Sequence, residues 1–392
     1  MKRRKEMTKA KLLSKDRVRT ALDHWEPDRI PFDIGSTSAT GITAETYKNL
    51  LSYIGVKKDI KIIDMMQQLA YLDEDFLKKF KVDTRGLSPN LPSGTKEEDE
   101  NYLYFTDSWE IKYRMPKKVG YYYDIWQSPL KGEIKKNDID KYPWPDPINL
   151  TEVGELKEKI EQWKNKNDPP ALVLEATGGG FFEYPFWLRG FENFYMDLVS
   201  DSSVACYLMD KILDYKMRCW EILLKAIGEY ILVVWESNDL GVQNGTMISP
   251  KMYKKYIKPR EKKLFAFIRK VSPKRIFIAY HTCGSVYDII PDLIEVGVDI
   301  LNPVQVSAAK MDTKKLKKEF GKDLTFWGGG VDTQHILPYG TPQQVKEEVK
   351  RRIDDLAPGG GFVFTPVHNI QAGVPPENII AMWETLQDYG KY

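Results

Sequence analysis

The chain has 392 residues, of which 42% are hydrophobic and 29% charged, a composition that fits a globular protein and excludes a disordered one. Its 58 lysines and arginines nearly balance 56 aspartates and glutamates, which predicts no general attraction to nucleic acid or to an acidic membrane. No run approaches the roughly 18 apolar residues of a membrane span, and three cysteines do not form a disulfide framework. We therefore expect a cytoplasmic protein.

Eight short apolar runs are typical of buried β-strands. In chain order they are RIPFDIGS (29–36), FKVDTRGL (80–87), ALVLEA (171–176), YILVVWE (230–236), RIFIAYH (275–281), VDILNP (298–303), DLTFWGG (323–329) and GFVFTP (361–366). Amphipathic helical patterns, such as SVYDIIPDLIEVG and TPQQVKEEVKRRIDDLA, lie between the later runs. This alternation predicts βα units that build a parallel sheet.

The number of units favours a (β/α)8 TIM barrel, which also fits the chain length. We expect one domain over residues 1–392, with an N-terminal helical extension that begins in the basic segment MKRRKEMTKAKLLSK. That segment lacks the apolar middle region of a signal peptide. A doubly wound open sheet is the alternative fold, but no G-x-G-x-x-G follows the first run.

Residues 100–130 depart from the barrel pattern. Aromatic and polar residues alternate there on both sides of the link PKKVG. A period of two around a short polar link predicts a β-hairpin, which we place as an insertion between barrel elements.

Polar and metal-ligating side chains gather at the predicted strand ends. Active-site residues of a (β/α)8 barrel project from the carboxyl ends of its strands. Here these ends carry Glu175, Glu236, His281, Asn302, the glycine loop 328–330 with Asp332 and, past the last strand, His368. Two of the four histidines and one of the three cysteines thus fall on one face of the predicted barrel.

The tripeptide His281-Thr-Cys283 is the strongest candidate for a metal site. Its imidazole and thiol lie on the same side of an extended segment, because side chains alternate along a strand. Both are zinc ligands, and His368 as a third would leave one coordination position open for substrate. Gln305 or Glu236 is a candidate fourth neighbour. The alternative is that Cys283 is a small buried residue and His281 a hydrogen-bonded pocket residue.

A second polar cluster follows the fourth apolar run. Within WESNDLGVQNGTMISP (235–250), the side chains of Glu236, Asp239 and Gln243 converge just past a strand end, which predicts contact with a substrate. The alternative is an ordinary polar turn before a helix that Ser249 caps. We add Asn302, Gln305 and Asp332 to the predicted substrate-binding residues because of their places at strand ends.

Three glycine-rich loops do not carry the lysine of a nucleotide-binding loop. In EATGGGFFEYPFW the glycines predict close backbone approach to a bulky ligand, with Phe181, Phe182 and Phe186 as apolar walls. Four other histidines and cysteines have no predicted function: Cys206 and Cys219 fit a helix core, and His24 and His335 fit capping or surface positions.

Five segments together resemble the uroporphyrinogen decarboxylase superfamily, and they run over most of the chain. They are RVRTALDHWEPDRIPFDIG, WESNDLGVQNGTMISPKMYKKYIKP, IAYHTCGSVYDIIPDLIEVGVDILNPVQ, LTFWGGGVDTQHILPYGTPQQV and GGGFVFTPVHNIQAGVPPENIIAM. The resemblance implies a (β/α)8 barrel with a deep cleft at its carboxyl face. It also implies one of two chemistries.

One implied chemistry is decarboxylation of a porphyrin precursor. Such enzymes use no metal and hold the carboxylates of a tetrapyrrole with arginines from a segment after the first strand. In this chain that segment is GSTSATGITAETY, without an arginine, although His368 matches a histidine in the last loop of the decarboxylases. A polycarboxylate needs such cationic partners, so the departure argues against this activity.

The other implied chemistry is methyl transfer with a corrinoid, as in methyltransferases similar to methylcobalamin:coenzyme M methyltransferase. These carry zinc on an H-x-C motif, which His281 and Cys283 match, and on a later cysteine, where this chain has His368. Gln305 stands where the more distant methionine synthase has a glutamate. The resemblance thus implies zinc on His281, Cys283 and His368, and a corrinoid as free cobalamin or on a partner protein.

Our sequence-based hypothesis is a zinc-dependent methyltransferase that moves a methyl group between a corrinoid and a small-molecule donor or acceptor. A decarboxylase of a porphyrin precursor is the alternative, and a non-catalytic corrinoid or tetrapyrrole carrier is a third. No D-x-H-x-x-G signature of a cobalamin module is present. We expect neither nucleic acid nor membrane as a partner, and the sequence leaves the oligomeric state open.

Overall fold

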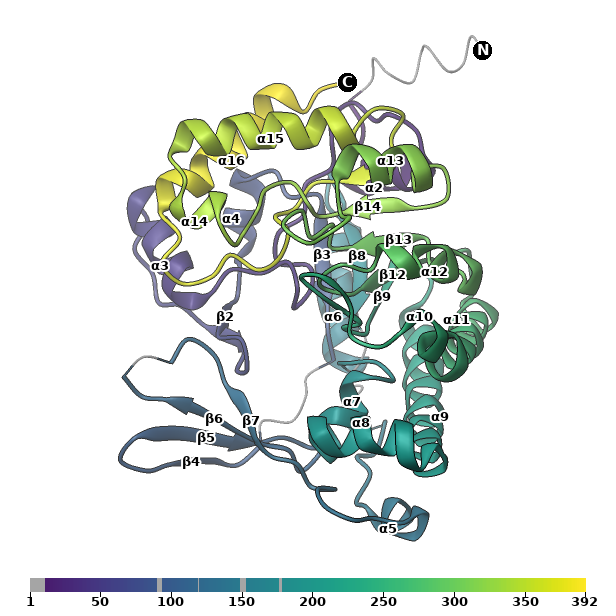
Figure 1. The fold of residues 1–392 in the computed structure, drawn as a ribbon. Coiled ribbons are helices and arrows are strands. Elements are labelled where there is room, and N and C mark those ends of the chain that lie inside the picture. The colour runs from purple at the N-terminus through teal and green to yellow at the C-terminus, as the bar shows by residue number, and fades with distance from the viewer. Residues whose placement is uncertain (1–10, 90–93, 119, 149–152, 176–177) are drawn as a thin grey trace.

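The computed structural model describes residues 11–89, 94–118, 120–148, 153–175 and 178–392. Its main sheet has seven parallel strands in the order β15-β14-β13-β12-β9-β8-β3 (Figure 1). Their bounds are β3 (Thr84–Leu87), β8 (Ala171–Glu175), β9 (Val233–Ser237), β12 (Phe277–His281), β13 (Ile300–Asn302), β14 (Thr325–Trp327) and β15 (Phe362–Val363). Six of them lie within a predicted apolar run, and β9 extends one residue beyond its run 230–236.

Residues 29–34 close this sheet into a ring. Phe32 forms a parallel bridge with Phe364, just after β15. On the other side, the amide of Asp83, just before β3, donates to the carbonyl of Phe32 over 2.9 Å. The segment therefore takes the place of an eighth strand, which confirms the predicted (β/α)8 barrel.

The helices surround the barrel and connect its strands. Their bounds are α2 (Ser14–Leu22), α3 (Ala44–Tyr53), α4 (Glu74–Lys79), α5 (Lys136–Lys141), α6 (Val153–Lys164), α7 (Glu183–Arg189), α8 (Phe191–Ser200), α9 (Ser202–Ile227), α10 (Pro250–Met252), α11 (Lys258–Val271), α12 (Ile290–Val296), α13 (Thr313–Phe320), α14 (Ile336–Tyr339), α15 (Pro342–Leu356) and α16 (Pro376–Tyr389), with a π-helical turn η2 (Tyr253–Ile257) and a 3₁₀ turn η3 (Tyr287–Ile289). In α2 the structure contains part of the predicted N-terminal extension, while residues 1–10 lie outside the described residues.

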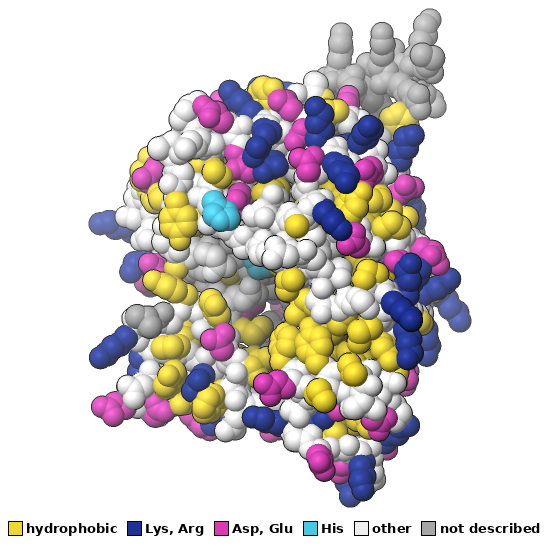
Figure 2. All heavy atoms as spheres, in the orientation of Figure 1, with side chains coloured by type: hydrophobic (Ala, Val, Ile, Leu, Met, Phe, Trp, Pro, Cys, Tyr) yellow, Lys and Arg dark blue, Asp and Glu magenta, His cyan; other side chains and the backbone are white. Residues whose placement is uncertain are grey.

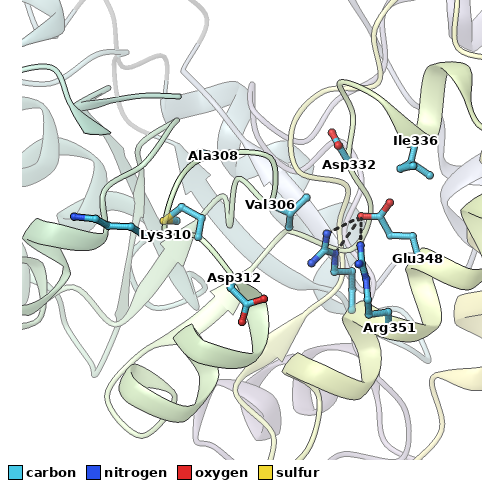
Figure 3. Close-up of a pocket in the computed structure, with 10 residues that line it drawn as sticks. Val306, Ala308, Lys310, Asp312, Asp332, Ile336, Glu348 and Arg351 are labelled. Carbon is cyan, nitrogen blue, oxygen red and sulfur yellow. Dashed lines mark hydrogen bonds and ion pairs between the residues drawn. The ribbon is translucent and has the colours of Figure 1, made fainter. Parts of the chain in front are cut away.

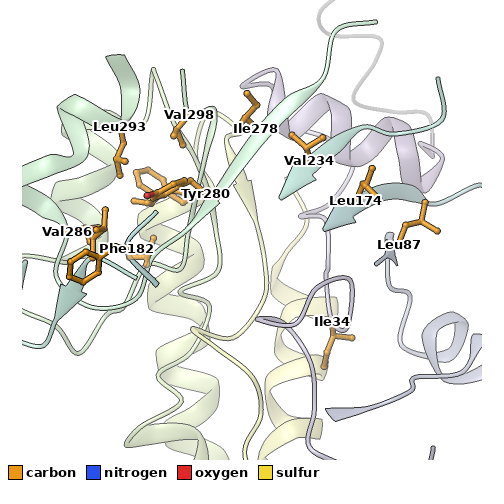
Figure 4. Close-up of a cluster of buried hydrophobic side chains, with 14 of the residues drawn as sticks. Ile34, Leu87, Leu174, Phe182, Val234, Ile278, Tyr280, Val286, Leu293 and Val298 are labelled. Atoms are coloured by element: carbon orange, nitrogen blue, oxygen red, sulfur yellow. The ribbon is translucent and has the colours of Figure 1, made fainter. Parts of the chain in front are cut away.

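Side-chain alternation along the strands separates two apolar cores. Val173, Val233 and Ala279 belong to the cluster that fills the inside of the barrel. Their neighbours Leu174, Val234 and Ile278 belong to the larger cluster between the strands and the surrounding helices (Figure 4). Since side chains repeat every two residues, these parities decide which strand-end residues point toward the barrel axis.

The predicted insertion is larger than a hairpin. It is a four-stranded antiparallel sheet in the order β4-β5-β6-β7, which stands apart from the barrel beside α7 and α8 (Figure 1). Its strands are β4 (Lys96–Glu98), β5 (Tyr102–Thr106), β6 (Lys112–Pro116) and β7 (Asp124–Gln127). The predicted hairpin corresponds to β6 and β7, which pair on either side of the PKKVG link.

Two short antiparallel hairpins complete the structure. They are β1 (Ile62–Asp64) with β2 (Leu69–Ala70), and β10 (Gly241–Val242) with β11 (Gly245–Thr246). Among the helices of the described residues, none combines the length and the apolarity that crossing a bilayer requires.

Candidate metal centre

His281 ends β12 on the inner side of the barrel, because it shares the parity of Ala279. Its ring nitrogen Nδ1 lies 2.5 Å from Oδ1 of Asn302, which ends the neighbouring strand β13. The amide nitrogen of Asn302 donates to the carbonyl oxygen of Trp327 over 2.6 Å. This second bond fixes the orientation of the amide, so Asn302 Oδ1 accepts a hydrogen bond from Nδ1–H and leaves the Nε2 lone pair of His281 free for a metal.

Cys283 and His368 meet His281 at this Nε2 side. The Cys283 Sγ atom lies 3.4 Å from His281 Nε2, and the rings of His281 and His368 are 5.4 Å apart in an edge-on arrangement. One ligand atom from each of the three residues lies within 4.8 Å of the others. The structure thus brings together the three side chains that the sequence predicted as ligands.

The donor set suits zinc. Bonds of about 2.0 Å to nitrogen and about 2.3 Å to sulfur place tetrahedral ligands roughly 3.5 Å apart, so small side-chain rotations suffice to close the observed spacing. Two imidazoles and one thiolate would fill three positions and leave the fourth open. The three residues therefore fit the metal that the H-x-C motif implied.

Burial sets the protonation of the two other ligands. It raises the pKa of the Cys283 thiol well above its usual value, and the nearby carboxylates of Asp239 and Glu183 raise this pKa further. Burial and the neighbouring His281 ring together lower the pKa of His368 to about 4. At neutral pH His368 is a neutral imidazole ready to ligate, while Cys283 must lose its proton when a metal binds.

Backbone contacts hold the Cys283 loop tightly. The Cys283 amide donates to Asp239 Oδ1 over 2.8 Å, and the Gly284 amide donates to Gln305 Oε1 over 2.8 Å. Gly284 has φ +82°, and a Cβ atom built there would lie 2.4 Å from the carbonyl carbon of Gly241. Only glycine fits this position, which fixes where the thiol of Cys283 points.

Three predicted substrate residues lie close to the cluster. Asn302 contacts His281 directly, and Asp239 Oδ1 lies 3.8 Å from its Nε2. The side chain of Gln305 does not contact a candidate ligand directly; it accepts from the amide of Gly284, the residue after Cys283. All three hydrogen-bond within the cluster or its loop, so each helps to position the candidate ligands.

Two further predicted residues lie on the rim. Gln243 donates to Gln334 over 3.0 Å at an exposed position of the β10–β11 turn. Asp332 accepts from the amide of Gln334 and pairs with His335 at 2.8 Å. Both contacts of Asp332 lie within its own loop, and neither reaches the three candidate ligands.

Glu236 is the predicted residue that the structure places elsewhere. It shares the outward parity of Val234 and forms a buried ion pair with Lys216 of α9, at 3.0 Å from Nζ to Oε2. Trp220 Nε1 donates to its other carboxyl oxygen over 2.5 Å, and Lys216 also donates to the carbonyl of Gly179 over 3.0 Å. These contacts give Glu236 a structural position outside the barrel.

Glu183 is an acidic group near the cluster that the sequence did not indicate. It opens α7, accepts from the amide of Gly180 over 3.2 Å and is 9% exposed. Burial and the Asp239 carboxylate raise its pKa to about 8. A glutamate three residues after the last of three glycines, in the loop past a strand end, was the available signal. The Phe181 and Phe182 side chains beside it are 2% and 0% exposed, so they belong to the core instead of the predicted ligand wall.

The cluster belongs to the face where Figure 2 shows a hollow between the barrel and the inserted sheet. Apolar side chains gather over α7 and α8 beside this hollow. On α8, Phe191 is 46% exposed and Met196 is 61% exposed, and Phe191 stacks on Tyr195. On the barrel wall, Glu175 accepts hydrogen bonds from Ser38 and from Ser88.

A family model for uroporphyrinogen decarboxylase matches residues 118–389. The chain belongs to this family. Two uroporphyrinogen decarboxylases resemble it at low identity. That of Geobacter sulfurreducens is 25% identical over 185 residues, which cover 47% of this chain and 48% of the relative. That of Pseudoalteromonas translucida is 21% identical over 271 residues, which cover 66% of this chain and 71% of the relative.

A solved structure is similar to this uroporphyrinogen decarboxylase family member over nearly its whole length. A methyltransferase from Methanosarcina mazei aligns with a TM-score of 0.67 at 15% identity, covering 96% of this chain and 99% of the other. At this identity the likeness shows a shared fold. The first curated relative is matched over about half its length, so activity is inferred from the site.

Proposed function

We propose that this member of the uroporphyrinogen decarboxylase family is a zinc-dependent enzyme that transfers a methyl group between a corrinoid and a small substrate. The observation that supports it is the convergence of His281, Cys283 and His368, whose ligand atoms lie within 4.8 Å of one another. The methyltransferase name of the Methanosarcina mazei structure agrees with this choice.

The chain's own residues would prepare the centre. Asn302 holds His281 in the tautomer whose Nε2 faces the ligand cluster. Asp239 and Gln305 hold the loop that carries Cys283. Bound there, zinc would supply a Lewis acid that activates a substrate thiol as a nucleophile or polarises the oxygen of a methyl donor. The corrinoid would be free cobalamin or would come on a partner protein.

Zinc analysis of the purified full chain tests the metal centre. We expect about one zinc per chain, lost in Cys283→Ala and retained in Cys206→Ala, a matched thiol deletion on α9. Both variants should keep the melting temperature of the wild type after the metal is removed. A wild-type chain without zinc, or a Cys283→Ala variant that keeps it, would overturn the centre.

Corrinoid spectroscopy tests the reaction. Mixing the zinc-loaded chain with methylcobalamin and a small thiol should convert the absorption of methyl-cobalt(III) into that of cobalt(I), and Cys283→Ala should abolish the change. No conversion with any methyl acceptor or donor would remove the methyl-transfer assignment and leave the metal result standing.

Decarboxylation remains the second candidate because both curated relatives are uroporphyrinogen decarboxylases. Against it, residues 35–47 offer no arginine for a polycarboxylate. Turnover of uroporphyrinogen that continues with a chelator present would establish this activity in place of the first.

A further inference from the structure

A groove separate from the candidate metal centre lies between the loop 306–312, which follows β13, and α15. It has a volume of about 480 Å³, in the range of sites for small ligands. In Figure 3, Glu348 and Arg351 of α15 lie beside Val306 of the loop after β13, whereas the Lys310 side chain points away from them. The lining residues are Val306, Ala308, Lys310, Met311, Asp312, Asp332, Ile336, Glu348, Arg351 and Arg352.

Most charges of this groove already have partners. Arg352 donates to Glu348 Oε1 over 2.9 Å and to Thr313 Oγ1 over 3.1 Å. Lys310 pairs with Asp288 at 2.9 Å. Asp312 accepts from a backbone amide at the start of α13, and Asp332 pairs with His335. These groups build the walls of the groove.

Two groups of α15 remain for a ligand. Glu348 is 6% exposed, and its Oε2 atom is buried without a hydrogen-bond partner among the residues that the structure describes. The Arg351 side chain is 61% exposed, and its nearest carboxyl oxygen is Glu348 Oε1 at 3.6 Å. In Figure 3 the dashed lines from the arginines run to one oxygen of Glu348. The other oxygen lacks a donor, which costs about 1–3 kcal/mol when nothing binds it.

We propose that this groove binds a small hydroxylated anion. Its phosphate or carboxylate would lie against the Arg351 guanidinium, which binds such planar or tetrahedral anions through paired N–H groups. A hydroxyl group of the same molecule would donate to Glu348 Oε2 once a rotation of the carboxyl group turns this buried atom toward the groove. A sugar phosphate or a sugar acid carries both groups and is small enough for the groove.

The groove is linked to the candidate metal centre through one loop. Its wall begins at Val306, next to Gln305, which binds the amide of Gly284 beside Cys283. Ser307 in the same loop donates to Gln334 over 2.6 Å. The proposal adds a site of its own and holds whether or not the chain transfers methyl groups.

Calorimetric titration of the full chain tests the site with four probes: ribose 5-phosphate, gluconate, inorganic phosphate and ribose. We expect ribose 5-phosphate or gluconate to bind at least tenfold more tightly than inorganic phosphate or ribose. Arg351→Ala should weaken that binding at least tenfold, whereas Lys346→Ala on the same helix should not. Because Arg351 is exposed, its replacement leaves the fold intact.

Glu348→Gln separates the hydroxyl contact from the anion contact. The variant should bind inorganic phosphate as the wild type does while it loses the preference for the hydroxylated anion. Circular dichroism and the melting temperature show whether it is folded, and Arg351→Ala decides the question if it is not. Equal affinity for all four probes, or unchanged binding in Arg351→Ala, would overturn the proposal and leave Glu348 Oε2 to a water molecule.

Discussion

Replacing Glu236 by glutamine tests whether this residue serves the fold or the substrate. In the structure both partners of the Lys216–Glu236 pair are at most 3% exposed, and 3.0 Å separates their charged atoms. Glu236→Gln would leave the Lys216 ammonium buried without a charged partner, with only neutral carbonyl and amide oxygens to accept its hydrogen bonds. Breaking a buried pair in this way costs about 3–5 kcal/mol, so we expect a large loss of stability.

The expected change in melting temperature follows from the chain length. An unfolding entropy of about 2.1 cal/mol/K per residue gives about 0.8 kcal/mol/K for 392 residues. A loss of about 4 kcal/mol then lowers the melting temperature by roughly 5 °C, which calorimetry resolves. As a control, Glu221→Gln on α9, the helix that carries Lys216, breaks an exposed pair with Lys225. The Glu221 and Lys225 side chains are 43% and 67% exposed, so this change should cost under about 1 kcal/mol.

A double variant sharpens the test. Lys216→Met combined with Glu236→Gln removes both charges, so it should be more stable than Glu236→Gln alone. The zinc content should stay at the wild-type value in the folded variants, because neither residue contacts the candidate ligands. A Glu236→Gln variant that melts like the wild type but loses turnover would refute the buried-pair reasoning and return Glu236 to the substrate site.

Three further predictions concern the metal centre. Asn302→Leu removes the acceptor of the His281 Nδ1 proton and should weaken zinc binding about 10–100-fold in competition with a chelator; an unchanged affinity would contradict the role of Asn302. Because burial raises the Cys283 pKa, the thiol is protonated between pH 6 and 8 and must release its proton when zinc binds. Each pH unit in this range should therefore raise the zinc affinity of the wild type by about ten times more than that of Cys283→Ala. Equal slopes would assign the released proton elsewhere. The His368 pKa is lowered to about 4, so protonation of this ring favours the unfolded chain. The free energy of unfolding should therefore fall by roughly 3 kcal/mol as the pH drops from about 6.5 to 4. Urea unfolding that shows the same fall in His368→Asn would contradict this.

Much of the fold and of the candidate ligand cluster could be predicted from the sequence. Apolar runs located all eight barrel segments, and the strand-end rule brought His281, Cys283 and His368 to one face. The outward orientation of the Glu236 side chain could not be predicted in the same way. Its strand is apolar on both faces, so the sequence does not show which of its side chains face the barrel axis. Its partner Lys216 lies on α9, the helix before this strand, and no sequence pattern links the two residues.

The insertion shows a second limit of sequence patterns. The aromatic and polar residues that alternate on both sides of PKKVG signalled one strand pair, which is β6 with β7. The β4 strand, Lys96–Glu98, is exposed throughout and has no apolar face to signal a strand. Its pairing with β5 is decided by backbone hydrogen bonds, which depend little on residue type.

Direct pairing of β3 with β8 has a consequence for how this scaffold can change. Thr84 lies opposite Ala171, so the barrel is continuous across the point where the chain leaves to build the inserted sheet. The sheet is thus an insertion in one connection, and its β5–β6 turn is anchored on the barrel side by Trp109, whose ring lies 4.3 Å from that of Tyr184 on α7. The strands β4 and β7 are exposed throughout, so sequence changes there alter the surface of the insertion while the Trp109 anchor and the register of β12 stay as they are.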